Sequence, residues 1–241
     1  MELANHINAT ARNGIGFRDV PWRLTDVLLV LAPFALIILT GFGTLTNQIV
    51  PSPNHGDRLA WLIPTLLFQG FSLIVPLWIA IRRIGIPMPP SVDEIREDAN
   101  YSMWLAPPCL LLIVFFTGGI VHLLGTASHP SDELSIRLDH AYLAWQTAFA
   151  VIIAPICEEI FFRGMIFNAL KRILPMWAAI IIQATIFGLF HGRDAATLIP
   201  IGLAGIIFSL VYERKQRLTA SIALHAACNL ISTAALWKVY A

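Results

Sequence analysis

The sequence predicts an all-α membrane protein, a polytopic bundle of about seven to eight transmembrane helices. Its 241 residues are 57% hydrophobic and only 13% charged, with a mean hydropathy of +0.71, whereas a soluble domain carries about 25% charged residues. The apolar residues fall into stretches near the length that crosses a bilayer as a helix, roughly 17–25 residues. The positive charges alternate between the loops that join these stretches.

Seven apolar stretches follow one another along the chain, and each is expected to form one helix. The fourth contains Pro155 and can continue to residue 170, the fifth ends at His191, and the sixth is short. Pro and Gly interrupt some of them, so six or eight spans also fit the pattern. The seven stretches cover residues 26–45, 59–81, 103–125, 142–162, 174–191, 197–212 and 219–237.

The distribution of Lys and Arg predicts the orientation of these helices, because cytoplasmic loops are enriched in positive charge. With the N-terminus inside, twelve of the sixteen Lys and Arg residues fall on the cytoplasmic side. The other four are Arg58, Arg137, Arg193 and Lys238. We therefore expect a multi-pass integral membrane protein with a cytoplasmic N-terminus, in the plasma membrane if the source is a prokaryote.

The charge balance and the cysteines exclude other classes of protein. A net charge of +1 offers no basic excess for holding phosphate backbones, so we expect membrane lipid and no nucleic acid as a partner. Cys109, Cys157 and Cys228 contain no CxxC pair and cannot form a complete disulfide framework.

Two adjacent carboxylates lie at depth in the predicted membrane. Thirteen of the fifteen acidic residues lie in loops or at the edges of spans, and the exceptions are Glu158 and Glu159. An ionisable side chain in hydrocarbon costs several kcal/mol unless it is paired or faces a wet cavity. This pair is therefore the first candidate for chemistry.

Helical geometry separates the roles of the two carboxylates. Residues at i and i+4 share a helix face, while neighbours diverge by about 100°. Glu159 therefore stacks on Arg163, and we expect a buried ion pair. Glu158 has no partner on its own helix, so it needs a proton, a donor from a neighbouring helix or a water. Such a group is suited to acid–base chemistry.

Histidine and asparagine side chains lie at compatible depth on later spans. His225 and Asn229 are at i and i+4, so both can face one cavity, although interhelical hydrogen bonding explains Asn229 equally well. At about 1.5 Å per residue from the cytoplasmic charges, these two and Glu158 lie roughly 12–20 Å deep and can meet. His191 comes out at about 28 Å, too deep unless its helix tilts or starts late.

Pro155 stands just before the carboxylates. Proline has no N–H, so it removes the backbone hydrogen bond to residue 151 of an α-helix. We expect a kink there, with one carbonyl left free to face water.

Three short motifs on successive apolar stretches carry a family resemblance. They are Glu158-Glu159-x-x-x-Arg163, Phe187-x-x-x-His191 and His225-x-x-x-Asn229. Together and in this order they resemble the motifs of the CPBP family, the CAAX-protease and bacteriocin-processing (Abi) intramembrane endopeptidases. Each motif alone is weak, and the combination is specific.

The resemblance covers residues 142–237, and the earlier part matches only as hydrophobic spans. It implies an all-helical membrane bundle around a conical cavity open to the membrane and the cytosol. With the apolar stretches and the charge distribution, it divides the chain into three expected parts: a cytoplasmic N-terminal segment over residues 1–25, N-terminal transmembrane helices over 26–141 and catalytic helices over 142–241.

The resemblance also implies a mechanism. Glu158 would be the general base that activates a water, and His191 would hold or polarise that water. His225 and Asn229 would donate hydrogen bonds to the developing oxyanion. The supporting residues would be Glu159, Arg163 and Phe187.

The sequence leaves a metal cofactor open. The family has also been described as metalloproteases, and Glu158, His191 and His225 resemble a His₂Glu zinc set. The sequence lacks the HExxH motif that places two ligands on one helical turn. We favour a glutamate-activated water without an obligatory metal.

The expected activity is hydrolysis of peptide bonds near the membrane surface, in CAAX-type or related precursor processing. The substrate would be a peptide or a membrane protein, and the sequence does not say whether it is prenylated. One alternative is a non-catalytic immunity or scaffold protein, which would tolerate loss of Glu158. A proton-coupled transporter is less favoured, because the chain shows no repeated halves with paired broken helices.

Overall fold

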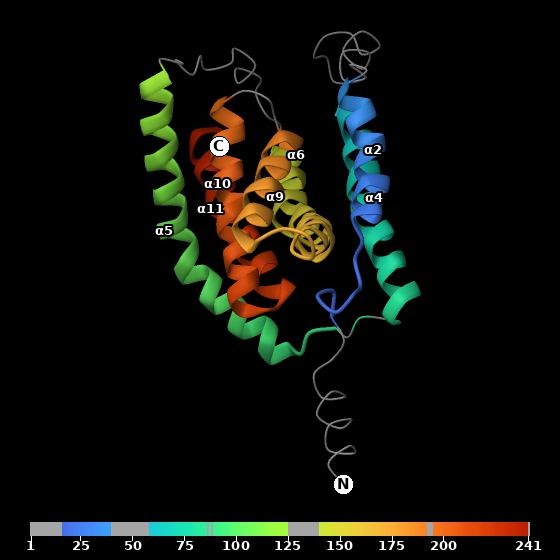
Figure 1. Ribbon diagram of the computed structural model, residues 1–241. Helices are drawn as coiled ribbons and strands as arrows, with labels where there is room; N and C mark the ends of the chain where they lie inside the picture. The colour runs from blue at the N-terminus through green and yellow to red at the C-terminus, as the bar shows by residue number, and fades with distance from the viewer. Residues whose placement is uncertain are drawn as a thin grey trace.

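The fold is described from a computed structural model, which describes residues 16–39, 58–85, 87, 89–124, 140–191 and 195–240. Every regular element in these ranges is helical, which confirms the predicted all-α class. Seven helical units follow one another there, and each overlaps one predicted stretch. They are α2 (Leu24–Leu39), α4 (Arg58–Ile84), α5 (Val92–Leu124), a composite helix over residues 140–170, α9 (Met176–His191), α10 (Ala195–Lys215) and α11 (Leu218–Tyr240) (Figure 1).

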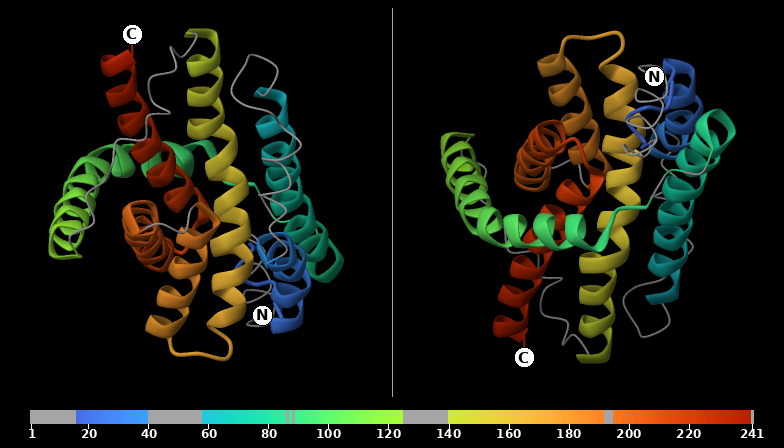
Figure 2. Two further views of the ribbon diagram at one scale, coloured as in Figure 1. Left: turned by 90° about the horizontal axis from the view of Figure 1, so that it is seen from above. Right: turned by 90° about the horizontal axis from the view of Figure 1, so that it is seen from below.

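The composite helix, called the central helix below, lies in the middle of the bundle. It begins as α6 (His140–Ala148), widens into the π-helical η2 (Phe149–Ile153) and continues as α7 (Ala154–Glu159). It then widens again in η3 (Ile160–Phe167) and ends as α8 (Asn168–Leu170). Figure 2 shows it between α2 and α4 on one side and α9, α10 and α11 on the other, all of which contact it. The adjacent carboxylates on α7 are therefore surrounded by other helices.

Several helices have the length and apolarity of membrane spans. Within the described residues, four stretches are long and apolar enough to cross a bilayer: Leu66–Ile84, Val92–Ile120, Thr197–Lys215 and Leu218–Ala235. The helix Met176–His191 is apolar but shorter. Large apolar side chains also face outward, as on α5, where Leu111 and Phe115 are about three-quarters exposed (72% and 75%). An apolar exterior of this kind suits lipid contact, as expected of an integral membrane protein.

α5 begins eleven residues before the predicted third span. Ser91 and Glu94 form a capping box: the Ser91 Oγ accepts the Glu94 backbone N–H at 3.2 Å, and the Glu94 Oε2 accepts the Ser91 N–H at 2.8 Å. This cap starts a polar first half, which bends into the apolar second half (Figure 2). The bend is explained by the adjacent Pro107 and Pro108 inside the helix.

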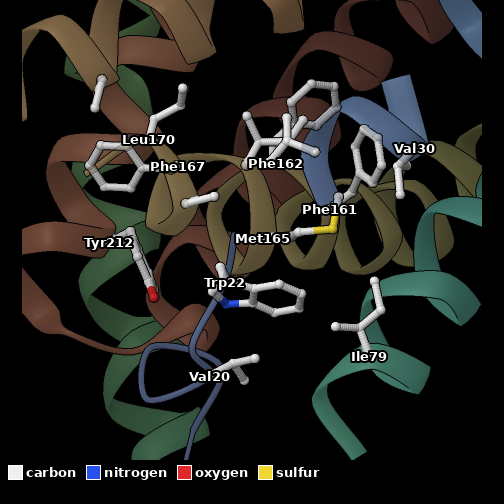
Figure 3. Packing of buried hydrophobic residues seen from close by; sticks show 14 of the residues in the cluster. Val20, Trp22, Val30, Ile79, Phe161, Phe162, Met165, Phe167, Leu170 and Tyr212 are labelled. Atoms are coloured by element: carbon white, nitrogen blue, oxygen red, sulfur yellow. The ribbon is translucent and has the colours of Figure 1, made fainter. Parts of the chain in front are cut away.

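The segment before α2 is part of the hydrophobic core. Val20 and Trp22 are buried against the central helix, near Phe161 and Met165 (Figure 3). The Trp22 indole N–H donates to the Phe17 carbonyl at 2.8 Å, which satisfies its polar atom. The end of the expected N-terminal segment thus packs inside the bundle, while residues 1–15 lie outside the described residues.

Ion pairs join helix ends that the predicted topology puts on the same side of the membrane. Arg83 at the end of α4 contacts Asp26 at the start of α2 at 2.6 Å. Arg217, in the turn between α10 and α11, contacts Asp98 of α5 at 2.6 Å. This bond raises the pKa of the Arg217 guanidinium further above its usual range, so the arginine stays charged. The pairs support the alternation of seven helices.

Close approach of α9 and α10 depends on glycine. A Cβ added at Gly188 would lie 2.9 Å from the backbone carbonyl oxygen of Leu198, and one at Gly205 would lie 3.2 Å from the Cα of Ala184. The two helices therefore touch backbone to backbone, as small residues allow in membrane bundles.

Replacing Gly188 by Ala is expected to lower the stability of the protein by about 1–3 kcal/mol, because the two helices must separate to admit the methyl group. Thermal unfolding in detergent measures the change. Gly118→Ala on α5 is the matched control, since nothing lies within 4 Å of a Cβ there. Equal stability of the two variants would contradict the close contact.

Candidate active site

Glu158 and Glu159 end α7 between the two π-helical segments. Both carboxylates are buried, at 6% and 0% exposure. After the half-buried Ile160, residues 161–170 are also buried, so the pair lies in the interior of the bundle. Short π-helical segments are frequent at functional sites.

Glu159 pairs with Arg163, as the i, i+4 spacing predicts. The Arg163 Nη1 donates to the Glu159 Oε1 at 2.7 Å, and both side chains are fully buried. The second guanidinium nitrogen donates to the Gly205 carbonyl at 2.9 Å. The guanidinium also lies over the rings of Phe187 and Phe208, 4.7 and 5.3 Å from their centroids. This cation–π contact and the ion pair fix the arginine in an apolar setting.

Glu158 receives a donor from a neighbouring helix, which is one of the three possibilities that its lack of a local partner leaves open. The Gln69 Nε2, from α4, donates to the Glu158 Oε1 at 2.9 Å. The other oxygen, Oε2, lies 3.7 Å from the His191 Nε2 and 3.9 Å from the His225 Nε2. This oxygen is buried and has no hydrogen-bond partner among the described residues. The structure therefore brings Glu158, His191 and His225 together around one unpaired carboxylate oxygen.

The two imidazoles are held by their Nδ1 atoms. The His225 Nδ1 lies 2.9 Å from the Glu159 Oε1, and the His191 Nδ1 lies 2.8 Å from the Phe187 carbonyl oxygen. Both oxygens can only accept, so each Nδ1 carries the proton. In the neutral rings, each Nε2 then presents a lone pair toward Glu158.

Aromatic rings set the orientation of both histidines. The His225 ring stacks on Phe208 of α10, with centroids 4.7 Å apart and planes 24° apart. The His191 ring lies 4.7 Å from the Phe187 ring on the same helix, as their i, i+4 spacing predicts. His191 is also the more open of the two, with 32% of its side chain exposed against 6% for His225. The site is therefore reached from the end of α9.

Asn229 contacts the central helix, and the structure gives it no contact with Glu158. The Asn229 Nδ2 donates to the Ala150 carbonyl oxygen at 2.7 Å. In η2 the Ala154 N–H bonds to the Phe149 carbonyl, five residues back. By the same register the Ala150 carbonyl would take its proton from residue 155, which is proline. Asn229 supplies the donor that Pro155 lacks.

This corrects the prediction made from Pro155. The α-helical register predicted a free carbonyl at residue 151 that faces water. The helix instead widens to π-helical register, which moves the orphaned carbonyl to residue 150, and a side chain satisfies it. Interhelical hydrogen bonding is therefore the role that the structure gives one of the two Asn229 N–H donors.

Replacing Asn229 by Ala is expected to cost about 1–3 kcal/mol of stability, because the Ala150 carbonyl loses its donor. Pro155→Ala restores a backbone N–H at the position that the π-helical register uses. The double variant should therefore lose less than the sum of the two single losses, by thermal unfolding in detergent. Simply additive losses would contradict the shared carbonyl.

The donor set does not close around a metal ion. With the proton on Nδ1, each histidine leaves its Nε2 lone pair free, and this is a tautomer that can bind zinc. Among the residues that the structure describes, however, no three His, Cys, Asp or Glu side chains are arranged to hold a metal ion. The reaction proposed for Glu158, His191 and His225 is written without a metal ion.

Two residues of the site were not predicted from the sequence. Gln69 contacts Glu158 directly, and Phe208 contacts both Arg163 and His225. Gln69 is a polar amide inside the second apolar stretch. A lone polar side chain there indicates a hydrogen bond to another helix, so the sequence could have pointed to this residue. Phe208 is one apolar residue among many in the sixth stretch, and nothing in the sequence distinguishes it.

Comparison with known proteins agrees with the family resemblance. Residues 140–231 match the family model described as type II CAAX prenyl endopeptidase Rce1-like. The membrane-embedded CAAX protease MroQ of Staphylococcus aureus is 37% identical over 170 residues, which cover 65% of this chain and 68% of that protein. No solved structure matches the chain significantly.

Two further relatives match over different lengths. The putative membrane peptidase YdiL of Bacillus subtilis is 36% identical over 78 residues, 32% of each chain. An uncharacterised protein of Mycoplasma capricolum is 24% identical over 241 residues, 92% of this chain and 69% of that one. With the extended match to MroQ and the three motifs in order, this chain belongs to the CPBP (CAAX protease) family of membrane proteases.

Proposed function

We propose that this protein is an intramembrane endopeptidase in which Glu158 activates a water for attack on a peptide bond. The observation that carries the proposal is the unpaired Glu158 Oε2, which lies within 4 Å of the Nε2 atoms of His191 and His225. A buried carboxylate oxygen beside two imidazole nitrogens is suited to general base catalysis.

The proposed reaction uses one water and no covalent enzyme intermediate. Glu158 takes a proton from the water while the water oxygen bonds to the carbonyl carbon of the peptide. His191, the more exposed histidine, orients that water through its Nε2. The carbon–nitrogen bond then breaks, and Glu158 returns the proton to the leaving amine. The products are a carboxylic acid and an amine, and the enzyme is regenerated.

His225 and Asn229 are proposed to stabilise the oxyanion. The His225 Nε2 can donate only when the ring is an imidazolium, since its Nδ1 already holds a proton toward Glu159. The Glu159 carboxylate, 2.9 Å away, would stabilise that positive charge. Asn229 has a second N–H beside the one given to Ala150. Glu159 and Arg163 would thus act by positioning His225, and Phe187 by positioning His191.

The proposed substrate is a peptide or a membrane-protein segment presented at the membrane. The name of the matching family model includes prenyl endopeptidase activity on CAAX proteins. Trimming of a precursor that carries no prenyl group is the alternative within the same chemistry. The apolar outer surface of the helices keeps the enzyme among lipids, where a lipid-anchored substrate is concentrated.

The test is cleavage of a quenched fluorescent peptide library by the detergent-solubilised protein, with and without a farnesylated cysteine in the peptides. The wild type is compared with Glu158→Ala, and both are repeated with a strong chelator. Cleavage that survives the chelator and is lost in Glu158→Ala supports the proposal. Cleavage that the chelator abolishes contradicts the metal-free step, and the absence of any cleavage favours the immunity or scaffold alternative.

We also propose that the N-terminus faces the cytoplasm. The ion pairs described above join helix ends on one side, which is the side rich in Lys and Arg. In a bacterial host, alkaline phosphatase fused after Gly85 should be inactive, and the same enzyme fused after Ala241 should be active. The reverse pattern would overturn this orientation.

A further inference from the structure

Glu158 depends on a residue outside the region that the family model matches. Gln69 lies on α4, some seventy residues before residue 140, where the match begins. Its side chain is 5% exposed, and its Nε2 lies 2.9 Å from the Glu158 Oε1. The other side-chain atom of this amide, Oε1, is buried without a hydrogen-bond partner among the described residues.

The contact divides the two oxygens of Glu158 between two roles. Oε1 is held by the Gln69 amide, and Oε2 stays unpaired toward the two histidines. A neutral amide donor stabilises a carboxylate without cancelling its charge, whereas an arginine would cancel it. The neighbouring Glu159 shows the opposite arrangement, since its Oε1 accepts from Arg163 and from His225. The hydrogen-bond donors therefore differ: Glu159 is neutralised by an ion pair, whereas Glu158 keeps its negative charge and can act as a base.

The position of Gln69 is fixed by packing around it. Phe68, its neighbour, contacts the rings of Phe161 in η3 and Phe190 in α9, with centroids 6.2 and 5.5 Å apart. The buried Ser72 hydroxyl donates to the Gln69 backbone carbonyl at 2.9 Å. α4 is thus anchored against the central helix at the level of the carboxylates, so the amide points at Glu158 from a rigid support.

We propose that Gln69 is a positioning residue for the peptidase reaction, which holds one oxygen of Glu158 by a neutral hydrogen bond so that the other stays free to accept the proton of the attacking water. The inference rests on the proposed function of Glu158. On this proposal, residues from both halves of the chain form the active site.

The test is the pH–rate profile of Gln69→Leu with a cleaved peptide from the library. Loss of a donor to the charged carboxylate makes protonation easier, so the acid-side midpoint should move up by about one pH unit. The value of kcat at the optimum should fall about tenfold or more, because the base is no longer aligned. KM should stay within about threefold, since Gln69 is not proposed to bind the peptide.

Gln183→Leu is the matched control. Gln183 is a fully buried amide on α9 that accepts from the Ser209 hydroxyl at 2.6 Å. The same substitution there should lower thermal stability without moving the acid-side midpoint. If Gln69→Leu fails to fold, Gln69→Asn, which keeps the amide one methylene further away, should shift the midpoint in the same direction.

The outcomes separate this inference from the proposed function. If Glu158→Ala abolishes cleavage but Gln69→Leu keeps the wild-type midpoint, Gln69 is only a structural residue and the inference is overturned. If Glu158→Ala cleaves like the wild type, the proposed function fails, and the inference fails with it. An upward shift seen at residue 69 and absent at residue 183 supports the positioning role.

Discussion

Glu158→Gln should lower kcat by about 10³-fold while the protein keeps its fold, because general base catalysis contributes about 10²–10⁴-fold. The substitution replaces one oxygen by an amide nitrogen of nearly the same size. It removes the charge and the proton-accepting capacity that the Oε2 position supplies between His191 and His225. Steady-state cleavage of a library peptide measures kcat, and thermal unfolding in the same detergent shows whether the fold persists.

Glu97→Gln is the control for loss of a carboxylate far from the site. Glu97 is exposed on α5 and pairs with Lys215 at 3.0 Å. Solvent screens an exposed ion pair, so this variant should keep both stability and activity. If Glu158→Gln retained a tenth or more of the wild-type kcat, Glu158 would not be the base.

Arg163→Met should be the most destabilising of the substitutions considered, at about 3–5 kcal/mol, because it leaves the Glu159 carboxylate charged and buried without its cation. Neither side chain of the pair is exposed to solvent. The Gly205 carbonyl also loses its donor from Arg163. Thermal unfolding in detergent measures the loss, and a poor yield of folded protein would be consistent with it.

The double variant Glu159→Gln with Arg163→Met tests the reason for that loss. The glutamine is neutral, so no uncompensated charge remains, and its carbonyl can still accept from the His225 Nδ1. The double variant should therefore be more stable than Arg163→Met alone. A double variant less stable than the single one would show that the burial of an unpaired charge is not the cause.

The sequence predicted the arrangement on each helix well, because helical spacing alone decides it. The i, i+4 relations placed Glu159 on Arg163 and Phe187 beside His191, and the structure has both contacts. The estimate that put His191 too deep assumed that its helix starts near residue 172. α9 instead begins at Met176, which shortens the path to His191 to about 22 Å.

The contacts between helices were harder to predict, because no spacing rule links distant segments. The bond from Gln69 to Glu158 joins residues 89 positions apart. The bond from Asn229 to Ala150 joins residues 79 positions apart and needs the π-helical register of η2. Hydrophobic patterning reports that a helix forms, but it does not distinguish an α-helical from a π-helical turn. The burial of Trp22 in the core was missed for a similar reason, since it precedes the first helix.

The widened turn η2 before Glu158 sets how this stretch responds to a change in chain length. A π-helical turn holds one residue more than an α-helical turn. Removing one residue between Ala150 and Pro155 would therefore let the helix close in ordinary α-helical register while the segments on either side keep nearly the same rotation about its axis. The Ala150 carbonyl would then stand four residues before the proline and would still need the Asn229 donor. Residues 151–153 should therefore accept the loss of one residue, whereas an insertion would add a second extra residue and turn Glu158 away from α4.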